Sequence, residues 1–164
     1  GIEKVGEKFR SLKTSLRRAD RAFRKVYRVD KKLIGIIGEL EKLIAAGATA
    51  TPNMNEIDKK LKAGRDELKR EGEVLIYIHD IKGKIDSVAD ATVKTDLTTK
   101  FDKLEKLSLA KFANIKSKYT SMEKAIGKPD WAKATKQLGE CKRTAQNLAD
   151  VFLGMEAIEK QITK

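Results

Sequence analysis

The residues best suited to chemistry in this sequence are cations clustered near its beginning. Residues 1–32 contain twelve Lys or Arg and four Asp or Glu, and twelve minus four leaves +8, against +12 for all 164 residues. Six of the nine arginines fall between Arg10 and Arg28. Guanidinium groups bind phosphate through paired hydrogen bonds. If the positive charge served only solubility, lysine would be as suitable as arginine. This cluster therefore predicts contact with a phosphate-bearing partner.

The spacing of these cations, at steps of three or four residues, places many of them on one face of a helix. Like charges in that arrangement repel each other by roughly a few tenths of a kcal/mol, so the row is not explained by helix stability. The alternative interpretation is a solvated face, or charges paired with acids of a neighbouring helix. The candidate polyanion-binding residues, here called the cationic stripe, are Arg10, Lys13, Arg17, Arg18, Arg21, Arg24, Lys25, Arg28, Lys31 and Lys32.

The favoured partner of the stripe is nucleic acid, contacted through its backbone phosphates. The sequence has no helix-turn-helix punctuation, zinc-finger spacing or exposed aromatic platform, so base-specific binding is not predicted. A nucleoid, virion-core or packaging role fits such a sequence-nonspecific binder. Two alternatives stay open. An anionic membrane surface would require the apolar face of the first helix to become accessible. A structural protein would associate with itself or with helical partners through its heptad seams.

We expect no enzymatic activity and predict no catalytic residue, metal site or cofactor. The only histidine, His79, lies beside a core position and is expected to border solvent, and the only cysteine, Cys141, lies on a core seam. Glu-x-x-His pairs, zinc-ligand spacing and a phosphate-binding glycine loop are all missing from the sequence. No apolar run reaches the length of a membrane span. A single cysteine cannot form an intramolecular disulfide, which favours a cytoplasmic location and does not exclude secretion. The expected packaging role would also fit a virion interior.

The elements that position the stripe are predicted from apolar residues that recur at steps of three and four. Four segments carry this pattern, at about 3–46, 52–87, 95–126 and 131–162, and the turns between them are short. We therefore predict an all-α fold, an antiparallel up-down-up-down four-helix bundle of long helices that spans residues 1–164 as a single domain. Its first helix begins with the strongly basic part, 1–32. Asp30 interrupts the first seam, and a break there would give five helices. An unbroken first helix would project beyond the bundle.

Finer features of the turns are also predicted. Gly47 and Gly127 occupy positions typical of helix C-caps. The second helix starts either at Thr51-Pro52 or with a capping box of Asn53 and Glu56. Thr95 and Asp130 are the predicted N-caps of the last two helices, at the ends of the polar stretches 86–94 and 127–130. In the second segment Leu75 is assigned to the core. The regular apolar spacing of this segment is interrupted at Glu71 or Gly72.

Overall fold

The computed structural model describes the backbone of residues 2–49 and 51–162 and the side chains of residues 23–47 and 51–162. It contains five α-helices: α1 (Ile2–Thr49), α2 (Met54–Leu68), α3 (Glu71–Asp86), α4 (Ala91–Gly127) and α5 (Trp131–Ile162). No strand occurs in the described backbone. The predicted all-α fold is confirmed.

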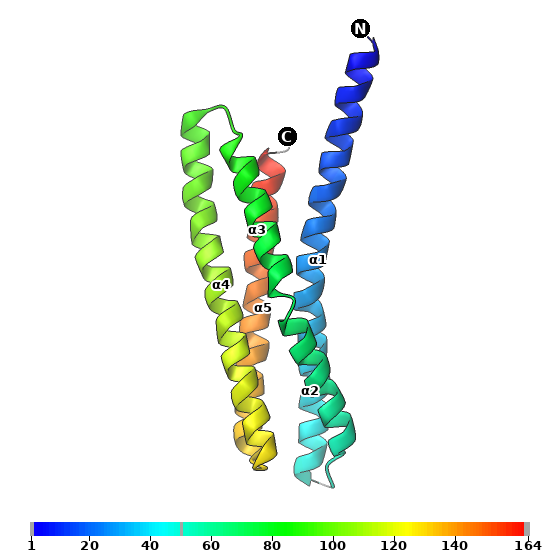
Figure 1. Ribbon diagram of the computed structural model, residues 1–164. Coiled ribbons are helices and arrows are strands. Elements are labelled where there is room, and N and C mark those ends of the chain that lie inside the picture. Colours follow the sequence, from blue (N-terminus) through cyan, green and yellow to red (C-terminus); the bar gives the residue numbers. More distant parts are fainter. Residues whose placement is uncertain (1, 50, 163–164) are drawn as a thin grey trace.

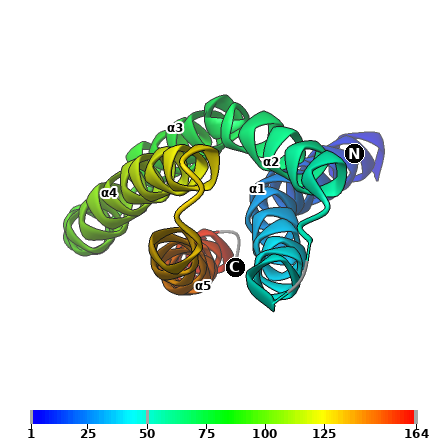
Figure 2. The same cartoon turned by 90° about the horizontal axis from the view of Figure 1, so that it is seen from below.

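The helices form four antiparallel arms, of which the second consists of α2 followed by α3 (Figure 1). Seen from below, the arms follow one another around the bundle, so that α5 closes the ring by packing between α4 and α1 (Figure 2). The helix α1 also packs against α2 and α3. In Figure 1 its N-terminal part continues past the ends of the other helices, as expected for an unbroken first helix.

Of the two alternatives that the sequence leaves open near Asp30, the unbroken helix is the one found, because α1 runs without interruption from Ile2 to Thr49. Asp30 instead keeps its seam position between Val26 and Leu33, and its side chain is only 1% exposed. Neither carboxylate oxygen of Asp30 has a hydrogen-bond partner. Burial raises the pKa of Asp30 to about 7. A continuous helix keeps every backbone hydrogen bond of this stretch, whereas a break would leave several buried amides without a hydrogen-bond partner.

The helix of the second arm, in contrast, is interrupted by a turn at Lys69 and Arg70, between α2 and α3. The backbone stays paired through this turn, because the amides of Lys69 and Arg70 donate to the carbonyls of Arg65 and Glu67. The turn changes the phase of the apolar seam. Val74 is therefore buried and Leu75 is exposed, so the assignment of Leu75 to the core is wrong.

The helix ends differ from the predicted caps in several places. No glycine in the described residues has a positive φ, and neither Gly47 nor Gly127 is a C-cap. Gly47 lies inside α1, where a Cβ would come within 3.0 Å of Pro52, so the reason for glycine there is close approach of the loop.

The N-terminal ends of α2, α4 and α5 are each capped by a side chain. Asn53 accepts a hydrogen bond from the amide of Glu56, at 3.3 Å, in favour of the second predicted start of α2. Asp90 caps α4 by accepting from the amides of Thr92 and Val93, so the predicted cap at Thr95 is wrong. Asp130 accepts from the amide of Lys133 at 3.1 Å, as predicted for the start of α5.

The core lies along the bundle axis and follows the predicted seams of α1, α4 and α5 closely. Cys141 is fully buried in α5, and burial raises the pKa of its thiol to about 12. His79 is exposed, as expected. In α4 the seam passes through the buried Ser108 and leaves Leu107 exposed, which decides between the two residues that the sequence allowed.

Candidate polyanion-binding face

The described half of the cationic stripe lies on the exposed side of α1. All five of its members, Arg24, Lys25, Arg28, Lys31 and Lys32, are exposed, while Val26, Val29 and Leu33 on the same turns are buried. The alternation of charged and buried positions follows the helical period, so α1 turns its apolar face into the bundle and its cations outward. Arg10, Lys13, Arg17, Arg18 and Arg21 lie outside the described side chains.

Most of the described stripe residues form no ion pair with a described acid. Arg24, Lys25 and Arg28 form no ion pair with any acid of the described part of the chain. The ammonium of Lys31 lies 4.8 Å from the ring centroid of Tyr27, which is a cation–π contact within α1. Only Lys32 pairs with an acid, Glu67 of α2, at 3.7 Å. The interpretation that the stripe faces acids of a neighbouring helix holds for Lys32 alone among these five.

Cations on the other arms behave differently where helices meet. Lys60 of α2 pairs with Glu39 at 2.6 Å, Lys118 of α4 with Glu140 at 2.9 Å, and Lys142 of α5 with Glu41 at 3.2 Å. Further pairs between helices join Arg65 to Glu123, Lys82 to Glu105, Lys84 to Glu159 and Lys116 to Glu71. The bundle therefore pairs cations with acids at most of its helix interfaces, whereas several exposed cations of α1, like several exposed cations of the other arms, stay unpaired in the described structure.

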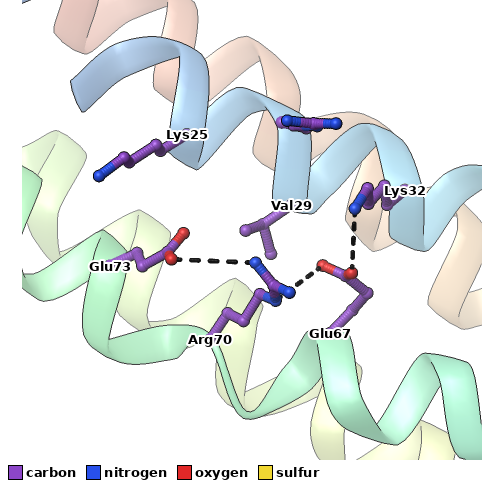
Figure 3. Close-up of a pocket in the computed structure, with 7 residues that line it drawn as sticks. Lys25, Val29, Lys32, Glu67, Arg70 and Glu73 are labelled. Atoms are coloured by element: carbon purple, nitrogen blue, oxygen red, sulfur yellow. Dashed lines mark ion pairs between the residues drawn. The ribbon is translucent and has the colours of Figure 1, made fainter. Parts of the chain in front are cut away.

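Part of the stripe borders a groove of about 170 Å³ between α1 and the turn that joins α2 to α3. The helix α1 contributes Lys25, Arg28, Val29 and Lys32, and the turn and its flanks contribute Glu67, Arg70 and Glu73. Figure 3 shows Arg70 between the two glutamates, with Lys32 directed at Glu67 and Lys25 on the opposite wall. Four cations and two carboxylates line the groove, which leaves a formal surplus of two positive charges.

The sequence did not identify Arg70 as a candidate. It lies 38 residues beyond Lys32 along the chain and lines the groove together with the stripe because the junction of α2 and α3 packs beside α1. The signal that was available is the interrupted seam at Glu71 and Gly72, which marked the place of the turn.

Comparison of the chain with models of protein families, with curated proteins and with solved structures gave no match. Within the described residues, no group of three or more metal-ligating side chains comes together. The helices that the structure describes contain no apolar stretch suited to crossing a bilayer.

Proposed function

We propose that this chain is a non-enzymatic binding or architectural protein that contacts nucleic-acid phosphates through the exposed cationic face of α1. The observation that carries the proposal is that Arg24, Lys25 and Arg28 lie together on the exposed face of α1 and have no acid partner among the described residues, whereas most cations at helix interfaces are paired. Cations held in a row on a folded helix release counterions when they meet a polyanion, and this release favours binding without reading bases. A nucleoid, virion-core or packaging role fits this chemistry.

The test is binding of a labelled duplex and a labelled single strand, measured by fluorescence anisotropy at two salt concentrations. The triple variant Arg24→Gln/Lys25→Gln/Arg28→Gln removes three exposed charges from α1. If each contacts one phosphate, the slope of log affinity against log salt should fall by about 2–3 for duplex DNA. The wild-type protein should bind at low salt and lose affinity steeply as salt rises.

A matched control removes the same charge elsewhere. Lys62 of α2 and Lys103 and Lys106 of α4 are exposed, and none forms an ion pair in the described structure. The variant Lys62→Gln/Lys103→Gln/Lys106→Gln should change the salt slope much less than the α1 variant. Equal losses in both variants would mean that net charge, and not the face of α1, governs binding. No binding by the wild type at low salt would end the proposal.

An anionic membrane surface is the rival partner, and one observation favours it. The N-terminal part of α1 continues past the other helices (Figure 1), so its basic amphipathic sequence is not enclosed by the bundle backbone. Insertion into lipid also requires accessible Phe9, Leu12, Leu16 and Phe23. The first three lie outside the described side chains, and Phe23 is half-buried against the core. Co-sedimentation with vesicles containing acidic headgroups, compared with neutral vesicles, separates this partner from nucleic acid.

A further inference from the structure

The groove beside Arg70 combines an excess of cations with a carboxylate that is poorly satisfied. Glu67 is 7% exposed, and its Oε2 atom accepts no hydrogen bond. Its ion pairs are loose: both the Lys32 ammonium and the Arg70 guanidinium lie 3.7 Å from its oxygens. Glu73 lies 3.9 Å from Arg70. Charge-assisted hydrogen bonds usually measure about 2.7–2.9 Å, so these three ion pairs are too long to be direct hydrogen bonds.

The remaining cations of the groove make its positive charge available to a ligand. Lys25 and Arg28 line it from α1 and have no acid partner in the described structure. Arg70 reaches it from the opposite wall (Figure 3). Three cations from two walls can surround a tetrahedral anion, and the guanidinium groups offer forked donors that match its oxygens.

We propose that this groove binds one phosphate group, held by Lys25, Arg28 and Arg70, and that Glu67 is the internal carboxylate with which this phosphate competes for Arg70 and Lys32. The proposal rests on the proposed function and adds a defined phosphate-binding site to the polyanion-binding face. The phosphate group belongs either to a nucleic-acid backbone or to a free anion, and the two arms of the experiment distinguish these sources.

The first arm measures binding of a short single-stranded oligonucleotide. Arg70→Gln should weaken binding, and Glu67→Gln should strengthen it, each by roughly three-fold, in the range of partly exposed charge pairs. The matched controls are Arg143→Gln and Asp150→Asn, which change the charge equally at exposed positions of α5 that have no ion pair in the described structure. Controls that change affinity as much as the groove variants would overturn the proposal.

The second arm uses inorganic pyrophosphate and backbone amide NMR spectra of the full chain. Localised shifts at 25–32 and 67–73, lost in Arg70→Gln, support the groove. Shifts spread evenly over surface cations, or no shifts, overturn it. Localised pyrophosphate binding without oligonucleotide binding would leave the groove as a site for free phosphate groups and would remove the proposed nucleic-acid function. Because Arg70 is half-exposed, its replacement should leave the thermal unfolding transition unchanged, and this is measured for every variant.

Discussion

Gly64 of α2 lies directly against the phenol of Tyr119 on α4. A Cβ at position 64 would stand 2.7 Å from the Cζ atom of the tyrosine ring and 2.9 Å from its Cε2 atom, far inside van der Waals contact. The same phenol donates a hydrogen bond to the carbonyl oxygen of Leu61, at 2.6 Å, one turn earlier in α2. The missing side chain at Gly64 is therefore what allows Tyr119 to fill the space between the helices and reach the backbone.

Replacing Gly64 by alanine should destabilise the bundle, although alanine is normally the better helix former. The methyl group must displace a rigid buried ring, and overpacking of this kind costs about 1–3 kcal/mol. The control is Gly83→Ala in α3, where a Cβ would meet nothing within 4 Å and the helix should gain up to about 1 kcal/mol. Urea unfolding measures both variants. A Gly64→Ala protein as stable as Gly83→Ala would contradict the packing at Tyr119.

Periodicity predicted the arms and most of the core because burial of an amphipathic face needs only a repeating apolar pattern. In α5 the predicted seam residues Leu138, Cys141 and Phe152 are all buried. Periodicity left open whether the first helix breaks where Asp30 interrupts its seam. The helix continues and buries the carboxyl group, and burial raises the pKa of Asp30 to about 7.

The candidate site was predictable in part. Exposure of Arg24, Lys25 and Arg28 follows from helical spacing alone, and the structure confirms it. The absence of acid partners depends on which helices come beside α1 and in what register, which local sequence does not encode. Arg70 required the position of the turn at α2 and α3, a three-dimensional relationship between segments far apart in the chain.

Removing the charge of Asp30 should stabilise the protein in a pH-dependent way. Its pKa of about 7 in the folded protein lies above the ordinary aspartate pKa of 3.8, so the folded state disfavours the ionised form. The penalty is absent below about pH 4, grows as the pH rises toward 7 and then levels off. Compared with wild type, Asp30→Asn should gain stability over this interval, by up to about 4 kcal/mol, since one pKa unit corresponds to 1.36 kcal/mol.

Urea unfolding of both proteins between pH 4 and pH 8 measures this difference. The exposed residue Asp58 provides the control, since Asp58→Asn removes an equal charge from the surface of α2. A stability difference between Asp30→Asn and wild type that stays constant with pH would show that Asp30 does not titrate in this range.

Cys141 should resist thiol reagents in the folded protein. Its side chain is fully buried between α4 and α5, and burial raises its pKa to about 12, so almost no thiolate forms at pH 8. A chromogenic disulfide reagent at pH 8 should react slowly without denaturant and rapidly and stoichiometrically in high urea. Rapid stoichiometric labelling of the native protein would mean that the packing between α4 and α5 opens readily.

Exchanging arginine for lysine on α1 tests whether the guanidinium group matters beyond its charge. The variant Arg24→Lys/Arg28→Lys keeps the net charge, so the salt slope of nucleic-acid binding should stay the same. Affinity should fall several-fold at every salt concentration, because lysine cannot form the forked contact with phosphate. Arg143→Lys on α5 is the control and should leave affinity unchanged. Binding that is equally tight after the exchange would show that α1 acts as a row of point charges, and the preference for arginine between Arg10 and Arg28 would then require another explanation.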